Sequence, residues 1–509
     1  MAALVIIAVV LLVVVIAVFY LGTLFGSKQE QVLARIPGMN PTNSEDGNMP
    51  DITVAGSLHE FLVKLHTKYG HVATFWYGKT HVISLASAKA FKDTNKLFDR
   101  PAVLFNFVKP LIGPDSIQYA NEEDGKRRRH DYDQSFSYDA IKNYYSKFYE
   151  ATDAVVAKIE SLSSDEHINI TEHMSLLVLK ALSHATYGDF FKDDEKAITM
   201  LRHYETAMAI LNQDISKDTE AGQRFAQALK TWHDFIRAMI QHRRDNPPND
   251  DDWTFIDVLM AKSSSEEELI SDATSYFIAG YHTTAFMMVW TFYYMCENQE
   301  VQEKIYQEII EVIGKDEQVN YVNLESLKYM RCVFDESMRC SVLAPFAARV
   351  NMHADMVVQG YTIPKGTPVV HALGVVLMDD EIWSEPERFI PERFLPENVS
   401  TRHPFSFQPF GFAGKRKYDN NGTEMFIIIS LSMEPMACNF MAVLNLKDTQ
   451  FGSCRSDNFM TTTYLQKGEG TKSSLNLADS RREQYNDVDI TILTDSRVDL
   501  LLPSCGHYS

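Results

Sequence analysis

The chain has 509 residues, of which 45% are hydrophobic and 11% aromatic, and this composition is typical of a large folded protein rather than a disordered one. Its 48 Lys and Arg against 68 Asp and Glu give a net charge of −20, which argues against a nucleic-acid-binding protein. The six cysteines include no CxxC pair, so their pattern indicates neither a zinc site nor a disulfide framework, and we expect a reducing environment facing the cytosol.

The N-terminal segment, residues 1–25, is an apolar run without a charged side chain. At about 1.5 Å per residue it can cross a hydrocarbon core of ~30 Å. The alternative is a cleaved signal peptide, but such peptides begin with a basic region and have a shorter apolar run. We therefore predict a retained single-pass anchor. Because Lys28 and Arg35 follow the run and no basic residue precedes it, the body should face the cytoplasm.

The rest of the chain divides by composition into three parts. Residues 26–56 are polar and rich in Gly and Pro, which predicts a linker. Residues 57–417 are mainly helical in period, with short β-rich runs, and predict one large, mainly α domain with small β sheets. Residues 418–509 show no sustained period, and we expect this divergent tail to be poorly ordered. The predicted helical and β-rich segments are 57–69, 139–163, 172–187, 220–243, 265–313 and 324–340 (helical) and 71–85 and 356–372 (β-rich).

The segment 277–295 is long and uncharged, yet its middle, Ala279-Gly280-Tyr281-His282-Thr283-Thr284, is polar. Adjacent threonines can bond back to carbonyls one turn earlier, and a glycine allows close approach to the backbone. Ser265 followed by acidic residues predicts a helix N-terminus, which favours a soluble helix. A pocket-lining helix, an ordinary core helix and a membrane span all remain open on these residues alone.

Four shorter motifs follow this segment. Glu336 and Arg339 lie three apart, so they share a helix face and can pair, although most such pairs are solvated. Residues 360–367, GYTIPKGT, predict a strand, a turn and a strand. A proline-rich stretch after Trp383 contains Arg393, which could bring a second cation to Glu336. Residues 409–417, PFGFAGKRK, form a glycine-bearing loop that ends in three basic residues.

Together, in this order and spacing, these motifs resemble the cytochrome P-450 family over residues 1–417. Residues 36–48 and 56–62 are more particularly similar to the vertebrate family-20 branch, whose substrate class is not settled. The resemblance implies a haem cofactor, an NADPH-dependent flavoprotein reductase as electron donor, a small apolar substrate, membrane attachment and no nucleic-acid partner. It implies a haem-thiolate monooxygenase that inserts one atom of dioxygen into the substrate.

The resemblance also assigns roles to individual residues. Thr283 matches the family threonine that hydrogen-bonds dioxygen and helps to deliver protons, with Thr284 beside it. His282 stands where the family usually has an acid, and a histidine can relay protons near neutral pH. Glu336, Arg339 and Arg393 match a buried structural triad. The residues assigned to haem binding are Gly280, Arg349, Phe410, Gly414 and Arg416. The basic run 126–129 falls near a second contact of the family with a haem propionate, but the usual tryptophan is absent and the register is open.

The sequence departs from the family at Tyr418. The family loop continues to a cysteine whose thiolate is the axial iron ligand, but here Lys417 is followed by Tyr418 and the helix that should come next is unrecognisable. A thiolate favours O–O cleavage, whereas tyrosine binds haem iron in other folds. We therefore assign no metal ligand. The alternative function is a haem-free, membrane-anchored pseudoenzyme or binding protein, and the axial residue favours this alternative for the chain as written.

Overall fold

The structure is a computed structural model, and it describes residues 28–411 except 137, 162–166, 192–193, 212, 214, 249–252, 315–319, 325 and 410, together with 455–456 and 463–466. Within these residues no helix is both long and apolar enough to cross a membrane. The predicted anchor, residues 1–25, and most of the tail lie outside them.

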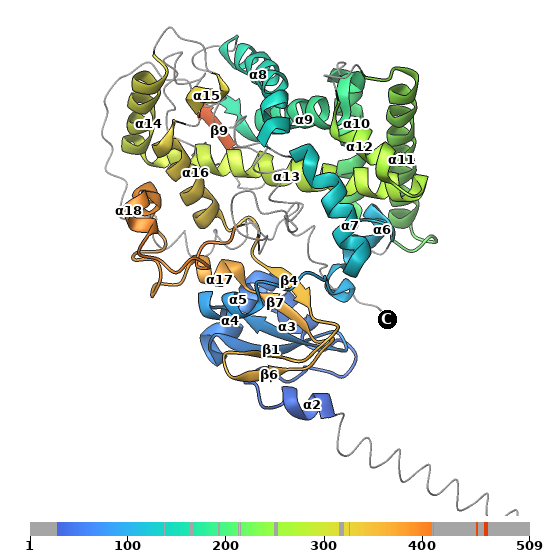
Figure 1. Cartoon of the computed structure of the whole chain (residues 1–509), viewed down its shortest axis with the longest axis vertical. Helices are drawn as coiled ribbons and strands as arrows, with labels where there is room; N and C mark the ends of the chain where they lie inside the picture. The colour runs from blue at the N-terminus through green and yellow to red at the C-terminus, as the bar shows by residue number, and fades with distance from the viewer. Residues whose placement is uncertain are drawn as a thin grey trace, which may run out of the picture.

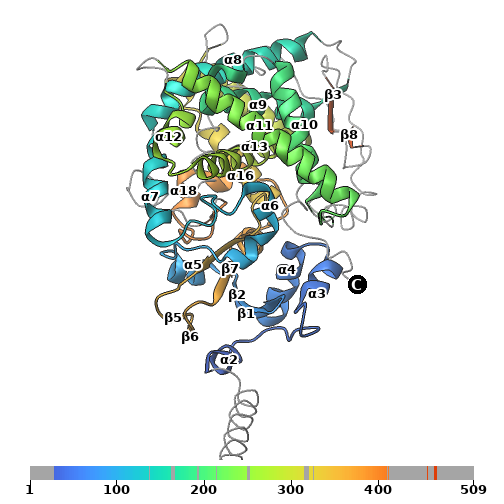
Figure 2. The ribbon, with the colours of Figure 1, turned by 90° about the vertical axis from the view of Figure 1, so that its right-hand side faces the viewer.

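A large helical region lies above a smaller region built around a sheet (Figure 1). The view from the side shows the same division (Figure 2). The mainly α prediction with small sheets is therefore confirmed. The longer helices of the helical region are α7 (Glu122–Asp133), α8 (Tyr138–Glu160), α9 (Ile170–Tyr187), α10 (Asp194–Ile210), α11 (Glu220–Asp245), α12 (Phe255–Lys262), α13 (Glu266–Glu297), α14 (Gln299–Val312) and α16 (Lys328–Ser341).

The smaller region contains a four-stranded sheet in the order β1-β2-β7-β4. Strands β1 and β2 form an antiparallel hairpin, β7 runs parallel to β2, and β4 runs antiparallel to β7, with Arg349 opposite Val369. Strands β5 and β6 form a separate hairpin. The strand and neighbouring helix bounds are β1 (Val72–Tyr77), β2 (Thr80–Leu85), β4 (Ala347–Val350), β5 (Met356–Val358), β6 (Tyr361–Ile363), β7 (Pro368–His371), α2 (Lys28–Leu33), α3 (Met49–Ala55), α4 (Leu58–Tyr69), α5 (Ala88–Thr94) and α17 (Leu373–Leu377).

The segment predicted as a linker contributes structure to this smaller region. Residues 28–56 include α2 and α3, and the Met39 N–H donates to the Thr74 carbonyl in β1 at 2.8 Å. Leu33 and Ile36 are buried in the core around the sheet. In the tail, β9 (Thr463–Gln466) pairs antiparallel with β3 (His167–Asn169) and with β8 (Arg455–Ser456). The segments 26–56 and 418–509 therefore both contain residues that contact the body.

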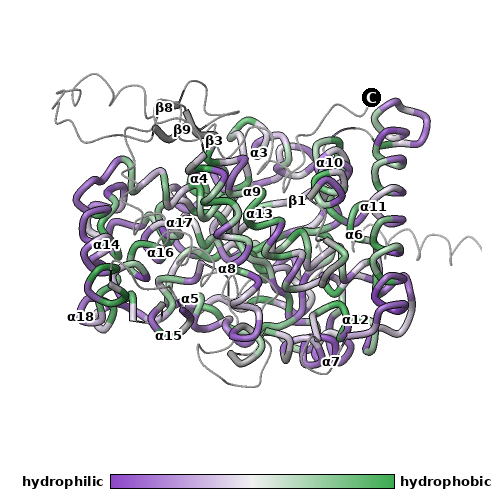
Figure 3. The backbone as a smooth tube through the Cα atoms, turned by 90° about the horizontal axis from the view of Figure 1, so that it is seen from above, coloured by the Kyte–Doolittle hydropathy of each residue, from purple (hydrophilic) through white to green (hydrophobic). Residues whose placement is uncertain are grey.

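Helix α13 is the centre of the helical region. Ser265 caps it by accepting a hydrogen bond from the Glu268 N–H, which confirms the predicted N-terminus. The predicted helical run 265–313 is two helices, because Asn298 ends α13 and α14 begins at Gln299. Helix α9 packs along α13. Hydrophobic segments gather at the centre of the molecule, whereas outer helices such as α7, α11, α14 and α18 (Pro396–Val399) show hydrophilic stretches (Figure 3). This distribution is typical of helices that cover a buried core.

Candidate active site

The middle of α13 contains a short polar stretch within the uncharged residues 277–295. Gly280 is buried, and the Thr283 hydroxyl donates to the Ala279 carbonyl one turn earlier at 2.5 Å, as the two-threonine pattern predicted. The Thr284 hydroxyl is buried and has no hydrogen-bond partner within the described residues. A buried hydroxyl without a partner costs roughly 1–3 kcal/mol, so the Thr284 hydroxyl is a group that a bound molecule could satisfy.

The ring of His282 lies in an aromatic layer between α13 and α10. Its centroid is 5.4 Å from that of Tyr204 on α10 and 6.1 Å from that of Phe286, which stacks on it. Tyr204 also contacts Trp232 of α11 at 5.3 Å between centroids. The hydroxyl of Tyr204 is buried and has no hydrogen-bond partner among the described residues. The structure therefore places His282 against α10, whose Tyr204 in turn contacts α11.

Three buried arginines form a cluster where the helical region meets the sheet. They are Arg100, in the segment after α5, Arg129 on α7 and Arg349 on β4. Nη1 of Arg100 and both Nε and Nη2 of Arg129 have no acceptor within the described part of the chain. Arg349 donates to the Ala348 carbonyl at 2.6 Å. We call these three residues the arginine cluster. Its unsatisfied N–H groups can bind an anion.

Burial and mutual repulsion act on the charges of this cluster. Burial is the largest cause that lowers the pKa of Arg349, and the nearby Arg100 and Arg129 lower it further. Burial and Arg100 lower the pKa of Arg129 to about 9. Burial lowers the pKa of Arg100 to about 10. All three groups would therefore gain from a negative charge placed among them.

The structure also shows where the four side chains of the basic run lie. Lys126 and Arg127 are exposed and pair with Glu123 and Asp124 on the surface of α7. Arg128 turns inward to Asp272 of α13, at 2.5 Å between Nη2 and Oδ1. Only Arg129 of this run joins the arginine cluster. Burial lowers the pKa of Arg129 and of Arg100, and the nearby Tyr276 of α13 acts in the opposite direction on both. The cluster therefore lies beside the helix that carries Thr283.

The three residues of the predicted triad lie together. Arg339 donates from Nε and Nη2 to the two oxygens of Glu336 at 2.8 and 2.9 Å, and both side chains have 0% exposure. Arg393 adds a third charge, with Nε 3.3 Å from Glu336 Oε1. Arg339 also donates to the Leu377 carbonyl at 3.0 Å, so the triad joins α16 to the end of α17 and to the segment around Arg393.

The segment that leads to residue 409 is anchored by aromatic contacts. Phe407 packs on Phe394 at 4.7 Å and near Trp383 at 6.3 Å between centroids, and the Arg402 guanidinium lies 4.2 Å from the Trp383 ring. The four remaining predicted positions, Phe410, Gly414, Arg416 and Tyr418, lie outside the described residues.

No motif in the sequence pointed to Arg100 or Tyr204. Arg100 offered a weak signal, an arginine between Asp99 and Pro101 next to the apolar residues 102–105. Tyr204 offered none, because an aromatic residue in an amphipathic helix is usually part of the core.

Comparison with known proteins agrees with this geometry. The family model described as "Cytochrome P450" matches residues 37–417. The chain is 31% identical over 362 residues to cytochrome P450 20A1 of Rattus norvegicus, covering 70% of this chain and 76% of the relative. It is 29% identical over 365 residues to cytochrome P450 20A1 of Homo sapiens, covering 70% and 77%. The similarity to the family-20 branch is therefore confirmed.

Among solved structures, the fold is similar to one described as the crystal structure of cytochrome P450DA heme domain. The TM-score is 0.71, the sequence identity is 18%, and the match covers 86% of this chain and 98% of the other. At this identity the match establishes the fold alone.

Proposed function

This chain belongs to the cytochrome P450 family, whose members are haem-binding monooxygenases, and we propose that, bound to a membrane, it catalyses the insertion of one atom of dioxygen into a small apolar substrate. An NADPH-dependent flavoprotein reductase would supply the electrons. The body would face the cytoplasm at the endoplasmic reticulum membrane, attached through residues 1–25.

The observation that carries the proposal is the arginine cluster. Arg100 and Arg129 are buried and keep N–H groups that have no acceptor among the described residues, and burying such donors unpaired is costly. The two carboxylates of haem would supply acceptors for these N–H groups. Arg100, Arg129 and Arg349 would hold those carboxylates by charge-assisted hydrogen bonds.

The residues of α13 would then line the face on which dioxygen is activated, which is the chemistry that haem supplies when bound. Thr283 would donate its hydroxyl hydrogen bond, at present made to Ala279, and help to deliver protons. Thr284, whose hydroxyl has no hydrogen-bond partner in the described part of the chain, would hold a water or a polar group of the substrate. His282 would carry protons toward Thr283, because an imidazole exchanges protons near neutral pH.

A second candidate function rests on Tyr418. Its position after Gly414-Lys415-Arg416-Lys417 is the position of the family's axial cysteine, and tyrosine is not a thiolate donor. This observation favours a protein that can still bind a ligand but does not catalyse oxygen insertion. Such a protein would be a membrane-anchored, haem-free pseudoenzyme or binding protein.

Haem titration of the purified full-length chain tests the proposal and separates the two candidates. We expect uptake of haem by the wild-type chain, at least tenfold weaker uptake by Arg129→Gln and Arg349→Gln, and unchanged uptake by Arg127→Gln, an exposed control on the same helix. Equal affinities in all four proteins would refute the role of the arginine cluster. Failure of the wild-type chain to take up haem would leave the binding-protein function in its place.

A further inference from the structure

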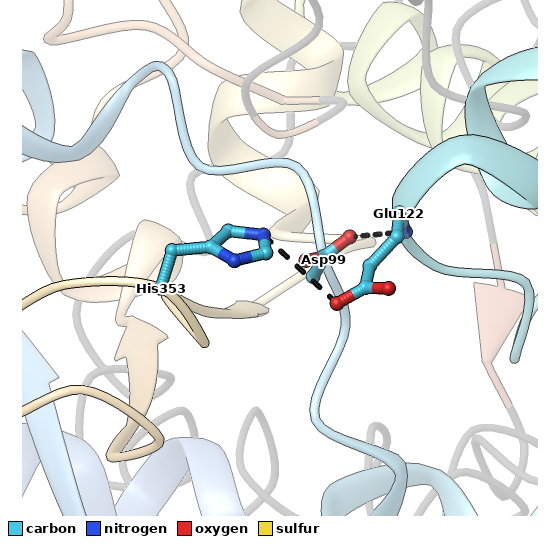
Figure 4. A group of neighbouring side chains, drawn as sticks. All are labelled: Asp99, Glu122 and His353. Atoms are coloured by element: carbon cyan, nitrogen blue, oxygen red, sulfur yellow. Dashed lines mark hydrogen bonds and ion pairs between the residues drawn. The ribbon is translucent and has the colours of Figure 1, made fainter.

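Three side chains outside the candidate active site converge near the surface between α7 and the sheet (Figure 4). They are Asp99, in the segment after α5, Glu122, the first residue of α7, and His353, in the loop between β4 and β5. One oxygen or nitrogen of each lies within 4.8 Å of the others. We call them the Asp99 triad. Residues so far apart in the sequence meet here only because of the tertiary fold.

Asp99 is the fixed member. It is 7% exposed, and its carbonyl accepts the Val350 N–H of β4 at 2.9 Å. One carboxylate oxygen, Oδ1, accepts the Glu122 N–H at 2.7 Å. Within the described residues no Lys or Arg forms an ion pair with this carboxylate, although it is more than nine-tenths buried. Among the described residues, the hydrogen bond that this carboxylate accepts comes from a backbone N–H, and its charge acts on Arg129 without forming an ion pair, so the carboxylate would gain from a cation bound directly to it.

The other two members can move. The side chains of His353 and Glu122 are 73% and 61% exposed, with Nε2 of His353 3.9 Å from Oε1 of Glu122. Ligands of a four-coordinate zinc ion lie about 2.0–2.2 Å from the metal, and therefore roughly 3.3–3.6 Å from one another. Rotation of two exposed side chains toward a fixed carboxylate can close that difference.

We propose that the Asp99 triad binds one divalent cation of the zinc class through two carboxylates and one imidazole. Three protein ligands of nitrogen and oxygen type, near the surface, leave a fourth position for water. The chemistry fits zinc better than calcium, because calcium takes six to eight oxygen ligands and the triad offers an imidazole nitrogen. The inference does not depend on the haem proposal.

The position of the triad gives the bound cation a structural consequence. Asp99 is adjacent to Arg100, Glu122 lies two turns before Arg129 on α7, and His353 follows Arg349 by four residues. A metal ion would therefore tie together the three segments that carry the arginine cluster. The negative charge of Asp99 raises the pKa of Arg129, and a bound metal ion would neutralise that charge.

The test is calorimetric titration of the metal-stripped, haem-free full-length chain with Zn²⁺ alone. The triad variants are Asp99→Asn, Glu122→Gln and His353→Gln. The matched controls are Glu123→Gln, an exposed acid one residue further along α7, and His130→Gln, an exposed histidine on the same helix. We expect a site of one equivalent in the wild type and both controls, and at least tenfold weaker binding in each triad variant.

Glu122 and His353 are exposed, so their variants keep the test decisive if the buried Asp99→Asn variant fails to fold. No zinc binding in the wild type would overturn the proposal. Binding that the Glu122 and His353 variants leave unchanged would also overturn it, since the zinc would then sit elsewhere, for example on cysteine thiolates.

Discussion

Arg339 donates two hydrogen bonds to the carboxylate of Glu336, one turn earlier in α16, and neither side chain is exposed to solvent. Arg393 adds a third charge from a segment more than fifty residues away. Glu336 thus pairs with two cations, and it also accepts the Ile390 N–H at 2.8 Å. The arrangement joins α16 to the chain that leads to residue 409.

Replacement of Glu336 by Ala should destabilise the fold by roughly 3–5 kcal/mol, because it leaves the buried Arg339 without its partner. Arg388→Ala is the control, because Arg388 pairs with Glu385 at the surface and such pairs contribute at most about 1 kcal/mol. The midpoints of denaturant unfolding measure both. Equal losses in the two variants would contradict a structural role of the triad.

The stability of the fold should decrease as the pH falls from 6.5 toward 4, partly because of His66. Burial lowers the pKa of His66 to about 4, and its ring nitrogens bond to the Gly70 carbonyl and the Ser84 hydroxyl. Between these two pH values the unfolded chain binds a proton that the folded chain excludes. At pH 5 the loss should be about 2 kcal/mol relative to pH 7.5.

The variant His66→Gln should be less stable than the wild type at pH 7.5, yet lose less stability on acidification. Urea unfolding at the two pH values measures the difference. The exposed His130→Gln variant should show the same pH dependence as the wild type. A pH dependence in His66→Gln as steep as that of the wild type would assign the effect to other groups, such as His59.

His282→Ala should slow oxygen activation more than substrate binding, in a chain given an intact cysteine loop. The expectation follows from its position next to Thr283 in the chain and from the ability of an imidazole ring to act as a proton carrier. Since His282 also packs on Tyr204, His282→Phe is the informative control, because it keeps an aromatic ring and removes the proton carrier. Turnover and the coupling of NADPH to product are the measurements. Wild-type values in His282→Phe would show that the residue only packs.

The acceptor sites for N-linked glycans should stay unmodified in cells, because the predicted anchor places the body in the cytoplasm. These sites are Asn169, Asn398 and Asn421. Treatment of the expressed chain with a glycosidase, followed by measurement of its mobility, tests this. A glycan on Asn169 would reverse the predicted orientation.

The chain as written should not form a haem-thiolate centre. Tyr418 stands at the position of the axial ligand, and the nearest later cysteine, Cys438, follows no glycine-rich loop that could orient it. The spectrum of the reduced, carbon monoxide-bound protein should therefore lack the band of a thiolate ligand, and the appearance of that band would refute the prediction. Tyr418→Cys alone should not restore it, because the helix that normally follows the ligand is also absent from the sequence.

The sequence by itself determined the features that depend on local spacing. Ser265 before three glutamates begins α13, because a cap needs only neighbouring N–H groups. The back-bond of Thr283 follows from one helical turn. Glu336 and Arg339 pair because a separation of three residues puts them on one helix face. The order of such motifs also identified the family.

Only the tertiary structure decided which distant side chains meet. Arg129 and Arg128 are neighbours in the sequence, yet one joins the arginine cluster and the other pairs with Asp272, because adjacent residues on a helix point about 100° apart. Arg349 reaches the cluster through the pairing of β4 with β7. His353 reaches Asp99 only because the fold places the loop after β4 beside the start of α7. These contacts are set by the packing of elements far apart in the chain, about which local periodicity carries no information.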